Sequence, residues 1–302
     1  MGKVMVIGSS NTDMVITTAK IPVPGETIMG NDFSIIPGGK GANQAVAAAR
    51  AGSETIFITK TGDDDFGRKA LEGYKLDKIN TDKIFVDPDT PSGVAVIIVD
   101  ITTGQNSIVV APGSNSNLTP ENIRQIEPDI IKSDVLLVQL EIPIHSVESA
   151  LKIASENNVK TILDPAPAQN LTDHLLAMVD IITPNESETF ILTGIHPDSE
   201  ENTKKAGDDL LKKVKESVII TLGGKGVYYC SKKNGAQIFI PTREVKAVDT
   251  TAAGDVFNGY LAAELANGKN LIEAIEMANQ AATYSVCHKG AQTSIPYLKD
   301  LL

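Results

Sequence analysis

The segment 249–265, DTTAAGDVFNGYLAAEL, places the carboxylate of Asp255 in what should be the first turn of a strongly helical pattern. An acidic residue there is favourable because it interacts with free backbone N–H groups and with the helix dipole. The same N–H groups also bind anions, and the small residues Ala252, Ala253 and Gly254 would let a ligand approach them closely. The segment therefore predicts either a helix cap or an anion site with a carboxylate beside it.

A second candidate site is the glycine-rich segment 37–49, PGGKGANQAVAAA, which leads into an alanine-rich helical pattern. Gly38, Gly39 and Gly41 would permit either close packing of a helix on a sheet or the approach of a ligand, and the glycines alone favour neither. The segment is not a P-loop, because Lys40 is followed by glycine instead of serine or threonine. No GxGxxG motif follows the first predicted strand, so a nicotinamide-dependent dehydrogenase lacks its main sequence support.

Polar residues also follow several of the predicted strands. They lie at 10–13, at Glu141, at Asp164, at 185–186 and at 221–226. One such residue alone is usually a turn former. In open α/β sheets, however, ligands bind beyond the carboxyl ends of the strands, so polar groups after many strands predict a binding site at that edge.

The elements that must position these residues alternate between strand and helix. Apolar strand patterns stand at 3–9, 55–60, 134–140, 159–164, 180–184 and 217–223, and helical patterns at 40–52, 145–157, 203–215, about 253–267 and 271–286. Continuous apolar strands are typical of a parallel sheet that is buried between helices. We therefore predict a single α/β domain over residues 1–302, with a mostly parallel central sheet flanked by helices.

Two segments do not fit this alternation. Residues 26–37 and 93–113 have extended patterns, and the second is predicted to be a hairpin that turns at ITTG. We predict a small β-sheet lid formed by about 13–37 and 92–112 and inserted in the main domain. Because the apolar residues of this lid would otherwise be exposed, we expect a second subunit to cover it in a homodimer.

Composition limits the possible partners. The chain has 302 residues, 42% of them hydrophobic, and its 27 basic against 38 acidic residues give a net charge of −11. This charge and the absence of a basic block argue against nucleic acid as a partner. No signal-peptide pattern and no transmembrane-length apolar run occurs, so we expect a cytoplasmic protein with no membrane partner. Cys230 and Cys287 form no CxxC pair, which leaves a disulfide framework or a structural zinc site without support.

Several motifs resemble those of the carbohydrate kinases of the ribokinase family. The signature regions are GGKGANQAVAAARAG with TGDDDFG at 61–67, and DTTAAGDVFNG at 249–259. The similarity runs from VIGSSNTD through QLE, DPAPA, DIITPNE and TLGGKG to KGAQTSIP, and so covers essentially the whole chain. It implies a ribokinase-like fold and the ATP-dependent phosphorylation of D-ribose at O5. The acidic run 63–65 is then explained as turn and cap residues.

The resemblance also implies roles for particular residues. Asp255 would be the general base for the ribose O5 hydroxyl, and the N–H groups of Ala252, Ala253, Gly254 and Asp255 would form an anion hole. The implied sugar-binding residues are Asn11, Thr12, Asp13, Gly39, Lys40, Gly41, Ala42, Asn43, Glu141 and Asp255. Asn11 and Asp13 would face the same side of an extended segment. For Lys40 we favour ribose contact over a role limited to balancing nearby carboxylates.

For the nucleotide, the resemblance implies a groove formed by Asn185, Thr221, Leu222, Gly223, Gly224, Lys225, Gly226, Gly254, Asp255 and Asn279. Glu188 would act on Mg²⁺ through water, whereas Glu186 is better explained as a first-turn helix residue. A K⁺ site is implied at Asp249, Thr251, Ser285, His288, Gly290 and Ser294, mostly through backbone carbonyls. His288 is accordingly not predicted to be catalytic, and His145, His174 and His196 lie far from any motif.

Two other functions stay open at this point. A sister kinase that acts on deoxyribose, fructose or a nucleoside would share most of these motifs, and differences in pocket shape separate such substrates only modestly. A sugar-sensing protein that keeps the fold without catalysis is less favoured, because a sensor has no need of a base at Asp255.

Overall fold

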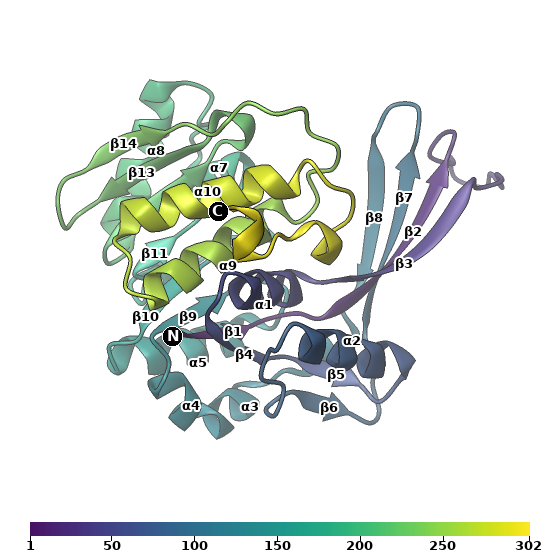
Figure 1. Ribbon diagram of the computed structural model, residues 1–302, viewed down its shortest axis with the longest axis horizontal. Coiled ribbons are helices and arrows are strands. Elements are labelled where there is room, and N and C mark those ends of the chain that lie inside the picture. Colours follow the sequence, from purple (N-terminus) through teal and green to yellow (C-terminus); the bar gives the residue numbers. More distant parts are fainter.

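The computed structural model describes all 302 residues. Its main body is an eight-stranded sheet between two layers of helices (Figure 1), with the strand order β14-β13-β12-β11-β10-β9-β1-β4. The bounds are β1 (Lys3–Ile7), β4 (Glu54–Ile58), β9 (Val135–Val138), β10 (Lys160–Leu163), β11 (Ile181–Ile182), β12 (Ser217–Thr221), β13 (Val227–Ser231) and β14 (Gln237–Ile240). Only the β12–β13 and β13–β14 pairs are antiparallel. The predicted mostly parallel sheet is confirmed.

Helices cover both faces of this sheet. One layer contains α1 (Lys40–Arg50), α2 (Asp65–Leu76), α9 (Ala253–Ala266) and α10 (Leu271–Ser285), and the other contains α3 (Pro120–Gln125), α4 (Glu127–Ile131), α5 (Ile144–Glu156), α6 (Asp173–Leu176), α7 (Glu186–Thr193) and α8 (Glu200–Lys213). In β1, Val4 and Val6 belong to the core on one face, and Met5 and Ile7 to the core on the other. Every β1 position from Val4 onward is therefore apolar, because alternate side chains enter two different cores.

Some elements of the main body were not predicted from the sequence. They are α2, α3, α4, α6, α7, the edge hairpin β13–β14 and the two short strands β5 (Lys60–Gly62) and β6 (Phe85–Asp87), besides short 3₁₀ segments at Gly113–Asn117, Gly223–Lys225, Gln292–Ser294 and Leu298–Asp300. In α2, only Gly67 and Tyr74 are buried, and the other residues of this helix are exposed or half-buried. Asp64 is the N-cap of α2 and accepts a hydrogen bond from the N–H of Gly67 at 2.8 Å, in agreement with its predicted role as a cap.

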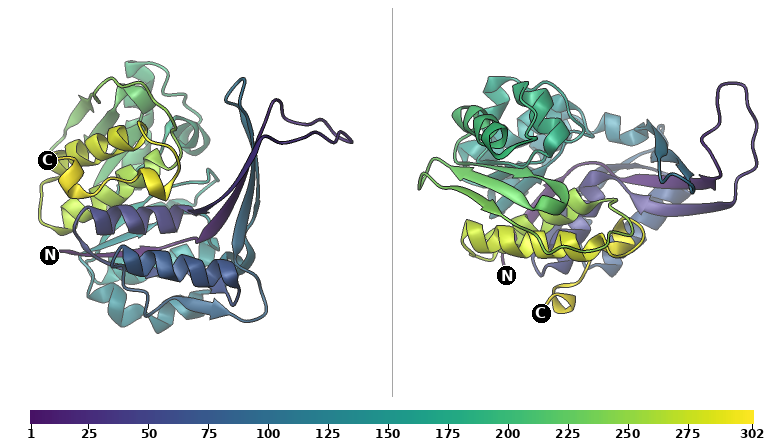
Figure 2. Two further views of the ribbon diagram at one scale, coloured as in Figure 1. Left: turned by 45° about the vertical axis from the view of Figure 1, so that its right-hand side comes forward. Right: turned by 90° about the horizontal axis from the view of Figure 1, so that it is seen from above.

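A separate four-stranded sheet forms the lid, with the order β3-β2-β7-β8. Its strands are β2 (Asn11–Thr18), β3 (Asp32–Gly38), β7 (Gly93–Asp100) and β8 (Asn106–Ala111), and they rise from the main body in Figure 2. The predicted lid is confirmed, but one detail of it was wrong: residues 26–31 are not a strand. The segment from Asn11 is extended, as expected for Asn11 and Asp13, and it starts the lid strand β2.

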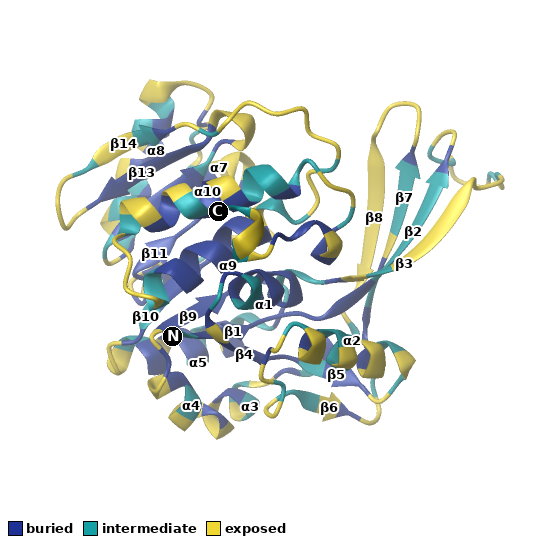
Figure 3. Cartoon of the chain, in the orientation of Figure 1, coloured by how far each residue is buried: buried dark blue, intermediate teal, exposed yellow.

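The outer strands of the lid are largely exposed, as Figure 3 shows. Every residue of β8 is exposed, and so are most of those in β3. Phe33, Ile35 and Val109 have exposed fractions of 54%, 53% and 69%. The lid thus presents apolar side chains on two unpaired edge strands, which is unusual for a sheet in contact with water alone.

None of the helices is long and apolar enough to cross a membrane.

Candidate active site

The predicted gathering of polar residues at one edge of the sheet is present. Strands β12, β11, β10, β9 and β1 are adjacent and parallel, so their carboxyl ends meet at one edge. The residues at or just after these ends include Ser9, Asn11, Glu141, Asp164, Asn185 and Thr221. The edge therefore collects groups that are more than a hundred positions apart in the sequence.

The start of α9 lies beside these residues and is not capped. Its N-cap, Ala252, has the left-handed backbone conformation (φ 62°, ψ 9°), and no side chain caps the helix. The N–H groups of Gly254 and Asp255 make no hydrogen bond within the protein. A Cβ atom placed on Gly254 would meet no atom within 4 Å. The helix start thus offers free donors facing open space, which is the arrangement that binds anions.

Asp255 does not cap its own helix, so that interpretation of the segment is wrong. Its carboxylate is buried and accepts hydrogen bonds from Asn43 Nδ2 to Oδ2 (2.9 Å) and from Gln44 Nε2 to Oδ1 (3.1 Å). Burial raises the pKa of Asp255, and this effect outweighs the lowering by Lys40 and by the two amides. The result is a carboxylate held away from its own backbone by α1.

Lys40 supplies the positive charge among the acidic residues near Asp255. Burial lowers the pKa of Lys40, but the surrounding carboxylates of Asp255, Asp164, Glu141 and Glu188 outweigh that effect and raise it overall. The ammonium group therefore stays charged and balances several acids at once. Ribose contact and charge balance, proposed from the sequence as alternatives, are compatible at this position.

A cavity of about 470 Å³ lies between the lid and the sheet edge. It is lined by Asn11, Val110, Pro112, Asn115, Ser116, Leu140, Glu141, Ile142, Pro143 and Pro167. Glu141 is held by the Ser9 hydroxyl (2.5 Å) and the Lys40 N–H (3.0 Å), both of which donate to Oε2. Asn115 Nδ2 donates to Asn11 Oδ1 at 2.8 Å. We call this space the sugar-side cavity.

Asn115 was missed in the sequence, because no motif marks it and the fold alone brings it to Asn11. The other predicted residues of this region lie close by. Thr12 pairs with Pro37 and Val94 inside the lid sheet, and the N–H of Ala42 donates to the carbonyl oxygen of Ser9 at 2.9 Å.

Asp13 and the glycine-rich segment fit tightly together. A Cβ on Gly38 would lie 2.3 Å from Asp13 Oδ2, and Gly39 has φ 91° and approaches the Asn11 nitrogen. Burial, followed by the charges of Glu141 and Asp255, raises the pKa of Asp13 to about 6. At Gly41, a Cβ would lie 2.6 Å from the carbonyl carbon of Gly8, the residue that follows β1. Close packing against protein atoms therefore accounts for all three glycines: the Asp13 side chain at Gly38, and the backbone that follows β1 at Gly39 and Gly41.

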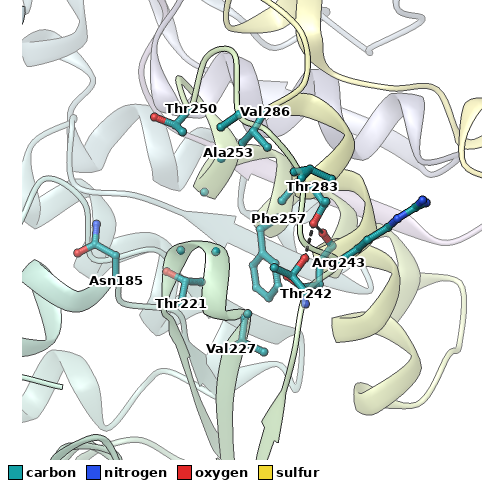
Figure 4. Close-up of a pocket in the computed structure, with 18 of the residues that line it drawn as sticks. Asn185, Thr221, Val227, Thr242, Arg243, Thr250, Ala253, Phe257, Thr283 and Val286 are labelled. Atoms are coloured by element: carbon teal, nitrogen blue, oxygen red, sulfur yellow. Dashed lines mark hydrogen bonds between the residues drawn. The ribbon is translucent and has the colours of Figure 1, made fainter. Parts of the chain in front are cut away.

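A second cavity of about 490 Å³ opens beside the start of α9 (Figure 4). Of the residues predicted for the nucleotide groove, it is lined by Asn185, Thr221, Gly223, Gly224, Gly226, Gly254 and Asn279. Leu222, Lys225 and Asp255 do not line it: Leu222 packs into the core, and Lys225 is exposed. The lining also includes Thr242, Arg243 and Val245, from a loop without a recognisable motif that the sequence analysis did not identify. We call this space the nucleotide-side cavity.

Glu188 and Asn185 form a capping box at the start of α7. The Asn185 N–H and Nδ2 donate to the Glu188 carboxylate at 2.8 and 2.9 Å, and the Glu188 N–H donates to Asn185 Oδ1 at 2.9 Å. Burial raises the pKa of Glu188, although the hydrogen bonds from Asn185 oppose this. Glu186 is exposed in the first turn of the helix, where the sequence placed it.

The residues predicted for a monovalent cation lie on two loops joined by Asp249, at the end of α10 and in the 3₁₀ segment Gln292–Ser294. Asp249 Oδ1 accepts from the Thr251 N–H and hydroxyl, and Asp249 Oδ2 accepts from the Gly290 N–H at 2.9 Å. These hydrogen bonds lower the pKa of Asp249 even though burial opposes them. His288 is exposed and stacks on Tyr284, far from a catalytic arrangement. Ser285 is buried at the end of α10, and Ser294 is buried in the 3₁₀ segment Gln292–Ser294.

Comparisons with known proteins agree with this geometry. A family model described as pfkB family carbohydrate kinase matches residues 1–298. A ribokinase of Haemophilus influenzae is 46% identical over 98% of this chain and 96% of its own length. A deoxyribokinase of Salmonella typhi is 35% identical over 98% of this chain and 96% of its own length. A solved structure of Arabidopsis thaliana ribokinase, complexed with ribose and ATP, superposes with a TM-score of 0.90 at 29% identity, covering 99% of this chain and 97% of that one.

Proposed function

Because the chain belongs to the pfkB family of carbohydrate kinases, we propose that it transfers the γ-phosphoryl group of ATP to O5 of D-ribose, forming D-ribose 5-phosphate and ADP. The observation that carries this proposal is the place of Asp255. The residue before it, Gly254, lines the nucleotide-side cavity. On the other side, the charge of Asp255 raises the pKa of Asp13, as does the charge of Glu141, which lines the sugar-side cavity. One carboxylate thus stands between the two substrate spaces.

In this reaction Asp255 accepts the proton of the O5 hydroxyl. O5 attacks the γ-phosphorus, the bond from that phosphorus to the β–γ bridging oxygen breaks, and ADP leaves with the electron pair. Burial makes Asp255 a stronger base by raising its pKa, while the positive charge of Lys40 favours the ionised form that the reaction requires.

The start of α9 stabilises the charge on the transferring group. The N–H groups of Gly254 and Asp255 are free of protein partners, and the positive end of the helix dipole adds to their effect. We assign the anion hole to residues 252–255. Because the donors are fixed by the helix, they need not reorganise when the negative charge moves.

The sugar hydroxyls are assigned to the polar groups around the sugar-side cavity and α1. Asn11 and Glu141 line the cavity, Asp13 lies on the same strand as Asn11, and Asn43 contacts Asp255. A furanose has several hydroxyls that must both donate and accept hydrogen bonds when they are buried. Amide, carboxylate and ammonium groups together meet that requirement.

The side chains of this site suit a Mg²⁺ ion that they contact through water and do not bind directly. No group of three or more His, Cys, Asp or Glu side chains could hold a metal by itself, and both Glu188 oxygens already accept hydrogen bonds from Asn185. A carboxylate oxygen has a second lone pair, so Glu188 can still accept from a metal-bound water. We propose this role for Glu188, with the nucleotide phosphates as direct ligands; bound there, Mg²⁺ neutralises phosphate charge.

We also propose a K⁺ site formed by the two loops that Asp249 joins, the end of α10 and the 3₁₀ segment Gln292–Ser294. The residues assigned to it are Asp249, Thr251, Ser285, His288, Gly290 and Ser294. The lowered pKa of Asp249 keeps a negative charge at this place, and backbone carbonyls supply the hard oxygen atoms that K⁺ prefers. A cation here would add positive potential behind the anion hole.

One assay tests the activity and its alternatives. Release of ADP is measured with ribose, 2-deoxyribose, fructose and nucleosides, with and without K⁺. We expect ribose to have the highest kcat/KM, because a missing hydroxyl leaves a buried polar partner unsatisfied. A preference for another sugar would assign the chain to a sister kinase. Ribose binding without any ADP release would instead identify a sensor.

We further propose a homodimer that pairs through the lid. A second copy of the chain is the occupant that fits, because two edge strands of one small sheet both expose apolar side chains such as Val109. Light scattering should report a dimer, Val109→Lys should weaken it, and Gln105→Lys in the hairpin turn should not. A monomeric wild type with full activity would refute this proposal.

Since ATP is the co-substrate of the proposed reaction, we place the reaction in the cytoplasm.

A further inference from the structure

Gln44 joins two buried carboxylates through a single amide group. It lies on α1, is fully buried, and its Nε2 donates to Asp164 Oδ2 at 2.7 Å and to Asp255 Oδ1 at 3.1 Å. Both hydrogens of the amide are thus donated to acids of different elements: Asp164 follows β10, and Asp255 lies in the first turn of α9. Burying these carboxylates without a donor would be costly, so the bridge is tightly constrained.

A second glutamine determines which way this amide faces. Gln139 Nε2 donates to Gln44 Oε1 at 2.5 Å, so the oxygen end of Gln44 is occupied and its nitrogen end must point to the two acids. The opposite orientation would bring three acceptor groups together without a proton. Gly8 makes room for this arrangement, because a Cβ there would lie 1.9 Å from Gln139 Oε1. A chain of hydrogen bonds therefore connects Gln139 through Gln44 to Asp255.

We propose that Gln44 is a positioning residue for Asp255, which it holds in the orientation that accepts the substrate proton. This inference rests on the proposed kinase function. Gln44 lines neither the sugar-side nor the nucleotide-side cavity, so it acts only through the carboxylate that it holds. Asp164 and Gln139 take part by fixing the two ends of the Gln44 amide.

Asn43 also contacts Asp255, but it serves a different purpose. Its Nδ2 donates to Asp255 Oδ2, whereas its Oδ1 is buried without any hydrogen-bond partner. An unsatisfied acceptor beside the sugar-side residues is ready for a substrate hydroxyl. Gln44, in contrast, has its whole amide satisfied by protein groups. It therefore holds Asp255 whether or not the sugar is bound.

The charges around Asp255 predict a pH signature for this role. The titratable groups that act on it are Lys40, Asp13, Glu141, Asp164 and Glu188. A hydrogen bond donated to a carboxylate favours its charged form, so loss of the Gln44 amide should make Asp255 protonate at higher pH. In a plot of kcat against pH, the acidic limb should then shift to higher pH. Simple loosening of the core would not produce this shift.

The experiment begins with wild-type enzyme, whose ribose-dependent ADP release tests the proposed function separately. In Gln44→Leu we expect kcat to fall by about 10- to 100-fold, KM for ribose to change by less than about threefold, and the acidic limb to shift upward. Gln280→Leu is the matched control, because Gln280 is an exposed glutamine of α10 that bonds only to the Leu301 carbonyl. Its kinetics should equal those of the wild type.

A second variant keeps the test decisive if Gln44→Leu does not fold. Gln139→Met leaves Gln44 in place but removes the donor that orients it, and should give a smaller change in the same direction. Folding is checked by circular dichroism and by thermal unfolding. The proposal is overturned if folded variants keep kcat within about threefold and an unshifted pH profile, even when their melting temperature falls.

Discussion

Two helices begin at the candidate site with an acidic residue at the same position, yet the two acids have different surroundings. In α7, Glu188 follows the N-cap Asn185 by three residues, and in α9, Asp255 follows the N-cap Ala252 by three residues. Glu188 turns back and closes a capping box with Asn185. Asp255 accepts no backbone N–H and is instead held by two amides of α1.

The difference lies in the N-cap residue. Asn185 has a side chain that satisfies a helix N–H, and Glu188 reciprocates. Ala252 has no such group and adopts a left-handed conformation that alanine rarely tolerates. The first helix therefore uses its carboxylate for its own stability. The second leaves its N–H groups free for a ligand and its carboxylate free for proton transfer, so local stability is lower where the chemistry takes place.

The largest effect should come from removing the free carboxylate. In Asp255→Asn we expect kcat to fall by at least about 10²-fold with ribose binding retained, because a neutral amide cannot accept the O5 proton. The acidic limb of the pH profile should disappear too, since activity falls as Asp255 becomes protonated below its raised pKa. Glu273→Gln, which changes an exposed first-turn acid of α10 outside both cavities, is the control. Near-normal turnover by folded Asp255→Asn would contradict the assignment of the base.

Giving α9 an acidic N-cap should be the next most severe change. Ala252→Asp adds a negative charge where the phosphate is proposed to bind, and we expect kcat/KM for ATP to fall by about 10-fold or more. Steady-state kinetics against ATP, with ribose saturating, measures this. Ala252→Asn is the neutral control and should lose less. An unchanged kcat/KM in the aspartate variant would show that the anion does not bind at this helix start.

Neutralising the acid of α7 should have a moderate effect. Glu188→Gln keeps an oxygen that can accept from the Asn185 N–H but loses its charge, so the cap is largely preserved. We expect the Mg²⁺ concentration for half-maximal rate to rise several-fold, because the variant loses a charged partner of the metal-bound water. A magnesium titration at fixed ATP provides the measurement. If the requirement for Mg²⁺ is unaltered, Glu188 is a structural cap and nothing more.

The smallest effects concern the free energy of unfolding, and they should have opposite signs at the two helix starts. Asn185→Ala removes a cap and should lower the free energy of unfolding by about 1 kcal/mol. Ala252→Gly relieves an unfavourable left-handed backbone and should raise it by about 0.5 kcal/mol. Urea denaturation of both variants beside the wild type tests the pair. The same sign for both changes would mean that the two helix starts do not differ in local stability.

Much of the framework was predictable because it depends on short-range patterns. The buried strands β1, β4 and β9 to β12 have continuous apolar segments, and α1, α5, α8, α9 and α10 began within about three residues of their predicted starts. Most of the elements that were missed are short or largely exposed. In α2 only Gly67 and Tyr74 are buried, β14 is a four-residue strand at the sheet edge, and α3, α4 and α6 have six residues or fewer.

By itself, the sequence determined the α/β alternation, the polar carboxyl ends of the strands, the separate lid and the glycine-rich and AAGD segments, because neighbouring residues carry all of these signals. Whether a first-turn acid caps its helix or serves a distant site was decided only by the tertiary structure. Asn43 and Gln44 are more than 200 positions from Asp255, and Asn115 is 104 from Asn11. Hydrogen bonds between such residues depend on the packing of whole elements, for which no local pattern exists.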